Sequence, residues 1–200
     1  MKKGIYVATV LILSTLSAAV YAQTPSATTG TNSTPAQSTS PVSIGGPATP
    51  PASSSKLSSS DRKFFQKAAG GGLAEVAAGQ LASSTSSSAD VKSFANQMVK
   101  DHTKANEELA QLAQAKGVTL PQAPDDSHQK DLDKLKQKQG ADFDKAYVKG
   151  QVSDHKATIS LFEKASKSTD PDIAAFAQKT LPTLKMHLVM VKGLQKKLPG

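Results

Sequence analysis

Apolar residues recur every three or four positions in four long stretches of the chain, which is the spacing of one face of an α-helix. The stretches begin near Asp61, Ser88, Asp142 and Asp170. The second is the most regular, and its apolar positions continue without a break almost to Gly117, a typical helix stop. No stretch alternates strictly between apolar and polar residues as a half-buried strand would. The pattern therefore predicts an all-α fold built on four long helices.

The connections between these helices predict how the helices are arranged. Serines link the first helix to the second, and Thr169-Asp170-Pro171 links the third to the fourth, because proline favours the first position of a helix. The middle connection, residues 117–141, is much longer and favours a short charged helix over residues 127–138. Two tight hairpins joined by a long crossover are typical of a ferritin-like up-and-down four-helix bundle. Pro182 lies inside the fourth stretch and is expected to kink or split that helix.

The start of the chain predicts export. Lys2 and Lys3 precede an apolar run that ends at Val20, and the segment through Ala22 offers small residues at the positions that a signal peptidase reads. We therefore expect residues 1–22 to be a cleaved signal peptide that directs the protein to the periplasm or out of the cell, and association with the outer membrane stays open. The alternative is an uncleaved anchor, for which the apolar run is at the short limit.

Residues 23–60 are rich in Ser, Thr, Pro, Gly and Ala, and Lys56 is their only charged residue. Such a segment has too little apolar surface to offset the entropy lost on ordering it. We expect a disordered linker over residues 23–60, followed by a folded domain over residues 61–198. Its role stays open between a solvated tether, a glycosylated stalk and a contact with the cell wall.

Charge and cysteine content exclude several classes of function. The 200 residues carry 24 basic and 16 acidic side chains, a net charge of +8, but lysines alternate with acids, as in residues 130–138. Because nucleic-acid binding needs a concentrated basic patch, we expect no nucleic-acid partner. Contact with an anionic envelope polymer or a membrane surface stays open, and the oligomeric state is unknown. A chain without cysteine has no disulfide, no thiolate metal site and no cysteine nucleophile.

Four polar side chains interrupt the apolar stripes that are expected to face inward. His102, His155 and His187 each lie on the stripe of a different helix. Glu75 lies on the first helix among glycines and alanines, which let a neighbouring helix approach closely. With a rise of about 1.5 Å per residue, the positions fall within about a turn and a half of the same depth. We therefore expect the four groups to meet in one layer at mid-bundle.

Two interpretations of this layer stay open. Three imidazoles and one carboxylate form a donor set that suits one transition-metal ion, namely zinc, copper or iron. Alternatively, the histidines bond to Glu75, to Gln151 or to the backbone and fix the register of the helices. Around a metal ion, we expect a second set of residues to support the ligands, and these are Met98, Asp101, Gln151 and Asp154.

The positions before the histidines argue against a di-iron oxidase centre. Such a centre needs a Glu three residues before the histidine on two helices. Val99, Val152 and Leu184 occupy those positions here. We therefore assign no catalytic residue and expect a non-catalytic binding or structural domain. The alternative is a metalloprotein that handles metal or carries out redox chemistry.

Four segments, taken in order, resemble one known family. They are Phe64-Phe65 with Ala74-Glu75 and Gly79, Phe94-Ala95 through Met98 to Asp101-His102, Phe143-Asp144 with Tyr147, Gln151 and His155, and Leu181-Pro182 with Leu184 and His187-Leu188. Over residues 62–198 the chain is similar to domain-of-unknown-function family 4142, exported bacterial proteins of the ferritin-like group that are often labelled as outer-membrane proteins. The resemblance implies a helical bundle and an exported protein. It implies no established activity.

Overall fold

The computed structural model describes residues 57–198, and these residues form five α-helices and no strand. The helices are α1 (Ser59–Thr85), α2 (Ala89–Ala115), α3 (Asp126–Lys136), α4 (Gly140–Ala165) and α5 (Pro171–Lys197). The all-α fold expected from the sequence is confirmed for this part of the chain. None of these helices is long and apolar enough to cross a membrane.

The helix starts are defined by capping side chains. The Ser58 hydroxyl accepts a hydrogen bond from the Asp61 backbone N–H, and Asp170 caps α5 in the same way at Asp172 and Ile173. Such a cap contributes about 1 kcal/mol. Because Ser58 is the cap, α1 begins at Ser59, two residues before the expected start of the folded domain at residue 61. Residues 23–56 of the expected linker lie outside the described residues, and so does the expected signal peptide.

The fourth long helix is not split at Pro182. α5 is continuous over its 27 residues with Pro182 inside it. Proline removes one backbone hydrogen bond, in this case to the carbonyl of Gln178. Pro182 and Gln178 are both exposed, so that water can bond to the carbonyl. The lost bond is therefore tolerated without a break in the helix.

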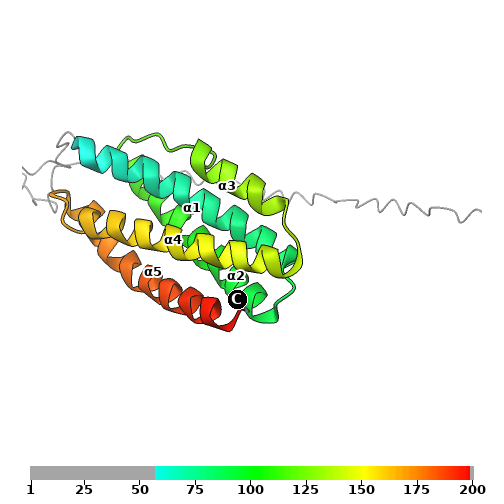
Figure 1. The fold of residues 1–200 in the computed structure, drawn as a ribbon. Coiled ribbons are helices and arrows are strands. Elements are labelled where there is room, and N and C mark those ends of the chain that lie inside the picture. Colours follow the sequence, from blue (N-terminus) through cyan, green and yellow to red (C-terminus); the bar gives the residue numbers. More distant parts are fainter. Residues whose placement is uncertain (1–56, 199–200) are drawn as a thin grey trace, which may run out of the picture. The chain divides into compact units, whose positions relative to one another are not determined.

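The four long helices pack side by side (Figure 1). α1 packs along α2 and α4 packs along α5, while α1 also contacts α4 and α2 also contacts α5. The short α3 belongs to the crossover and packs on α1 and α4. Residues 86–88 and 166–170 are the short links within the two helix pairs. Each long helix therefore contributes one face to a shared interior.

The interior contains two apolar clusters with polar residues between them. One cluster is rich in phenylalanine, and in it the ring of Phe64 meets the rings of Phe162 and Phe176 edge to face. The second cluster includes Phe94 and Phe143. On each long helix, a single buried polar residue lies in sequence between members of the first cluster and members of the second. These residues are Glu75, His102, His155 and His187.

Two buried aspartates join the helix pairs to each other, and we call them the aspartate staples. Asp61 in α1 accepts a hydrogen bond from Ser168 in the α4–α5 link (2.8 Å), and a second from Ser58 (2.6 Å). Asp144 in α4 accepts hydrogen bonds from Ser86 (2.5 Å) and Ser87 in the α1–α2 link (2.7 Å). Each pair of helices is thus tied to the link of the other pair, and this fixes the depth at which their mid-helix residues meet.

Candidate metal centre

The structure brings Glu75, His102, His155 and His187 together in the bundle interior. Glu75 and His102 are 6% exposed, and His155 and His187 are fully buried. Each residue comes from a different long helix. Neighbouring turns place apolar residues above and below them, so each polar group points inward with the rest of its stripe.

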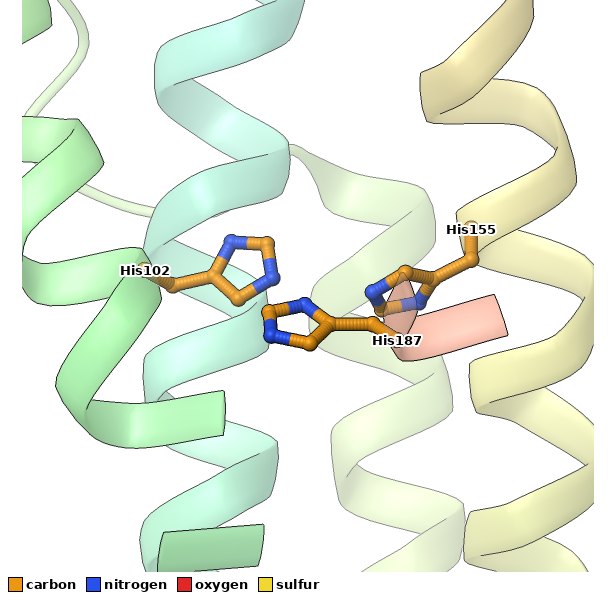
Figure 2. A group of neighbouring side chains, drawn as sticks. All are labelled: His102, His155 and His187. Carbon is orange, nitrogen blue, oxygen red and sulfur yellow. The ribbon is translucent and has the colours of Figure 1, made fainter. Parts of the chain in front are cut away.

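The three imidazoles, which we call the histidine cluster, form an almost equilateral triangle. The distance between ring centroids is 5.7 Å for His102 and His155, 5.5 Å for His102 and His187, and 5.5 Å for His155 and His187. Figure 2 shows the rings pointing toward one another from three helices. One nitrogen of each ring lies within 4.8 Å of the others. The three rings can therefore present donor atoms to one common point.

Hydrogen bonds assign the protonated nitrogen in two of the rings. His155 Nδ1 lies 3.0 Å from the backbone oxygen of Gln151, and His187 Nε2 lies 2.8 Å from Asp101 Oδ2. Both partners only accept, so these two ring nitrogens donate. In a neutral ring the other nitrogen then carries a lone pair. Those other atoms are His155 Nε2 and His187 Nδ1.

These lone pairs are buried without a partner. His155 Nε2, His187 Nδ1 and His102 Nε2 all lack a hydrogen-bond partner among residues 57–198. A buried polar atom without a partner costs about 1–3 kcal/mol. Each ring of the histidine cluster contributes one such orphaned nitrogen. The site therefore offers three buried nitrogens that have no partner in the described part of the chain.

Burial keeps two of the rings, His102 and His155, neutral at physiological pH. Desolvation lowers the pKa of His102 to about 3, and the neighbouring rings of His155 and His187 lower it further in the same direction. Desolvation likewise lowers the pKa of His155 to about 4, against a smaller opposing effect of the hydrogen bond to the Gln151 backbone. Neutral imidazole is the form that binds metal ions. The two rings are thus in the ligating state without any loss of protons.

Glu75 lies beside the histidine cluster, next to His155. Its Oε1 is 3.5 Å from His155 Nδ1, and its Oε2 accepts a hydrogen bond of 2.5 Å from the Gln151 side chain. Desolvation raises the pKa of Glu75 to about 8, although the Gln151 hydrogen bond lowers it. At pH 7 the carboxyl group is therefore mostly protonated and His155 is neutral. The contact between them is a polar contact of two neutral groups.

Two of the four residues expected to support the site contact it directly. Asp101 accepts the hydrogen bond from His187, and Gln97 donates a second one to the same oxygen at 2.7 Å. Partial burial raises the pKa of Asp101, but these hydrogen bonds outweigh it and hold the pKa below its ordinary value. Gln151 orients His155 through its backbone oxygen and Glu75 through its side chain.

The other two expected residues have different surroundings. Met98 is fully buried in the second apolar cluster, so its environment is that of a core residue. Asp154 is half-buried and lies within electrostatic reach of His128 and Asp131 in α3. Burial raises the pKa of Asp154, and its charge in turn raises the pKa of Glu75. Because α3 packs on α4, the residues that act on Asp154 electrostatically belong to the crossover helix.

Sequence reasoning missed two residues of the site. Tyr147 is fully buried one helical turn before Gln151, and its pKa is raised well above 10 by burial and by the nearby Glu75. Its hydroxyl and the Gln151 side-chain oxygen find no partner within the described part of the chain. The signal was a tyrosine on an apolar stripe, because a buried tyrosine hydroxyl normally needs a partner. Gln97 carried no comparable signal.

A cavity of about 40 Å³ adjoins the histidine cluster. His102, His187 and Glu75 line it, and residues of all four long helices complete its wall. Thr183 and Asn106 are half-buried in this wall and Lys67 is exposed, so the cavity leads from the buried rings toward the surface. The site is therefore accessible to small solutes.

Comparison with known proteins identifies a family and no characterised relative. The family model described as Domain of unknown function (DUF4142) matches residues 46–194. Comparisons with curated proteins and with solved structures give no match. The match covers all five helices up to residue 194, including every residue of the candidate site.

Proposed function

This chain belongs to the DUF4142 family, whose description assigns no activity, and we propose from the site that the domain binds one transition-metal ion through His102, His155 and His187. The observation that supports the proposal is the set of three orphaned nitrogens, one from each ring. A single cation at the centre of the triangle would satisfy all three. Burial also keeps His102 and His155 neutral, so these two rings bind it without releasing a proton.

The alternative is a polar layer that only fixes the register of the helices. The geometry of the rings does not favour this alternative. Such a layer stabilises a fold when its members bond to one another. The three rings face each other, yet none of the three inward nitrogens has a hydrogen-bond partner among residues 57–198. Glu75 and Gln151 are the members that do bond across helices. The register-fixing role therefore fits the Glu75–Gln151 pair and the metal role fits the histidine cluster.

The donor set indicates which ions the site suits. Imidazole nitrogen suits zinc, copper and iron, and Glu75 is a neighbouring carboxyl group beside His155. The apolar residues Val99, Val152 and Leu184 stand one turn before the histidines, where a di-iron centre would need glutamates. We therefore propose a mononuclear site, and a protein that binds or carries metal.

Topology and compartment complete the proposal. Two tight helix pairs, a crossover that carries α3, and contacts between α1 and α4 and between α2 and α5 support a ferritin-like up-and-down four-helix connectivity. The basic and apolar start of the chain supports export to the periplasm or beyond. An exported domain of this kind would bind metal ions outside the cytoplasm.

Metal analysis of the full chain, purified without a histidine tag, tests the proposal. The chain is dialysed against equimolar Zn²⁺ or Cu²⁺ and its bound metal is measured. We expect one ion per chain in the native protein and none in the double variant His102→Ala/His155→Ala. His128→Ala is the matched control, because His128 lies in α3, outside the histidine cluster, and should keep the full stoichiometry.

Two results would contradict the proposal. The first is native protein that retains no zinc or copper at micromolar concentration. The second is a double variant that still binds one ion per chain, since the ion would then lie elsewhere. A native protein without metal and a double variant that is merely less stable would support the register-fixing layer in its place.

A further inference from the structure

The cavity beside the histidine cluster is lined by only two of the three rings. His102 and His187 line the cavity, whereas His155 lies outside its lining. Both of these residues carry an orphaned ring nitrogen, and both are more than nine-tenths buried. An ion held by the three rings would lie at the edge of this cavity. One side of that ion would face open space.

The size of the cavity limits what can enter it. One water molecule needs about 10–15 Å³ of space open to a water-sized sphere, and the cavity offers about 40 Å³ of such space. Leu109, Phe162 and Leu184 form apolar parts of the wall, and these buried side chains cannot move aside easily. Asn106 and Thr183 supply polar groups toward the surface. The space suits one ligand of two or three heavy atoms at most.

Three protein ligands leave at least one position of a transition metal unfilled. We propose, on the basis of the metal site proposed above, that this cavity holds an exchangeable ligand of the bound ion, which is water, hydroxide or another small molecule or anion of up to three atoms. The ligand enters past Thr183 and Asn106. Larger anions and chelating side chains of other proteins are excluded by the apolar wall.

Azide binding to the copper-loaded full chain tests this inference, because azide is a triatomic anion whose bond to Cu²⁺ produces a charge-transfer absorption band. Two variants fill the cavity from two neighbouring helices without changing a ligand, Thr183→Leu in α5 and Ala105→Leu in α2. The control is Thr85→Leu, the same change as the first at an exposed helical position outside the cavity. We expect saturable azide binding in the native protein and the control, and affinity at least tenfold weaker in both filled variants, with one copper per chain throughout.

The outcomes separate this inference from the proposed function. Protein that binds neither zinc nor copper overturns both. Copper-loaded native protein that gives no azide band, or filled variants that bind azide as the control does, overturn only the exchangeable ligand. Loss of copper from both filled variants also overturns it, since the metal itself would then occupy the cavity. Where only one filled variant keeps copper, its azide affinity decides.

Discussion

The aspartate staples and the histidine cluster both bury polar groups, but they do so in opposite ways. In the staples, each oxygen of Asp61 and of Asp144 accepts a hydrogen bond from a serine hydroxyl. In the histidine cluster, three ring nitrogens face one another and none has a partner in the described part of the chain. The same bundle thus contains a satisfied polar network near its links and an unsatisfied one at its centre.

This difference separates groups that hold the fold from groups available to bind something. Buried polar groups in native proteins are nearly always hydrogen-bonded, and the exceptions call for an explanation. The staples show that serine hydroxyls can serve as partners within this chain. The bare nitrogens of the histidine cluster are therefore a local feature of one layer. Removing a staple should affect folding, and removing a histidine should affect binding.

The largest expected effect is on stability, from Asp144→Ala. This variant removes two hydrogen bonds to a buried carboxyl group and leaves the Ser86 hydroxyl only the longer contact of 3.2 Å with the Ser88 backbone oxygen. We expect the free energy of unfolding to fall by about 3 kcal/mol, since a hydrogen bond to a charged group contributes roughly 1.5–3 kcal/mol. Urea denaturation measures the change, and metal stoichiometry should stay the same. Asp142→Ala, at an exposed position in the same helix, is the control and should change stability by less than about 0.5 kcal/mol.

Replacing a ring of the histidine cluster should abolish metal binding but change the stability of the metal-free protein little. Metal at a hundredfold excess over its dissociation constant stabilises the native protein by about 2.7 kcal/mol. His155→Leu should lose this stabilisation completely. The metal-free variant should remain within about 1 kcal/mol of the native protein, because a leucine of similar size removes an orphaned nitrogen. Thermal melts with and without Zn²⁺ check this, and a metal-free variant as unstable as Asp144→Ala would mean that the ring is structural.

The pH dependence of stability distinguishes the members of the central layer by sign. Burial lowers the pKa of His102 to about 3 and of His155 to about 4, while the unfolded chain takes up these protons near pH 6.5. Their contribution is therefore present above pH 6.5 and is lost as the pH falls toward those values. Burial raises the pKa of Glu75 to about 8. Its contribution is present below its ordinary pKa and is lost as the pH rises through 8.

We therefore expect metal-free protein to be most stable near pH 6.5. Between pH 6.5 and 4.5 two histidine protons oppose one glutamate proton, so stability should fall by about 1.4 kcal/mol per pH unit, roughly 2–3 kcal/mol in all. Toward pH 8 the loss should be about 1–2 kcal/mol, from Glu75 alone. Urea denaturation across this range measures the curve. Glu75→Gln should flatten the alkaline limb and steepen the acid limb, and a curve unchanged by this variant would contradict the assignment.

The helices could be predicted from the sequence because each of their signals is local. The apolar spacing, the caps at Ser88 and Asp170 and the stop at Gly117, which adopts a positive φ of 64°, act within a few residues. The staples could not be predicted in the same way. Asp144 and Ser86 are 58 residues apart, and nothing in either segment indicates that they meet. Pro182 does not split its helix, because it is exposed and water can bond to the carbonyl that loses its partner. This exposure depends on the tertiary structure and could not be predicted from the local sequence.

In the candidate site, too, local features could be predicted from the sequence and tertiary contacts could not. The inward positions of Glu75 and the three histidines follow from periodicity and rise, and the structure brings these residues together. The roles of their neighbours depend on which atom faces which helix. In the sequence, Tyr147 occupies one more position of an apolar stripe. Asp101 and Asp154 carry the same expectation of supporting the metal ligands, and each directly precedes a histidine of the cluster. In the structure only Asp101 orients a ring of the histidine cluster, and that ring belongs to His187.

The smallest expected effect tests this inequality between the two aspartates. Asp101→Asn keeps the size of the side chain but removes the charge that accepts the His187 N–H, and loss of such a supporting carboxylate typically weakens metal affinity about 10–100-fold. Asp154→Asn is the matched control, and its affinity should stay within about threefold of the native value, since that carboxyl group bears on Glu75 and α3. Competition with a chromophoric chelator measures both affinities. Equal losses in the two variants would show that general negative charge near the bundle centre attracts the ion. A loss confined to Asp101→Asn would show that orientation of His187 decides how tightly the histidine cluster holds its metal.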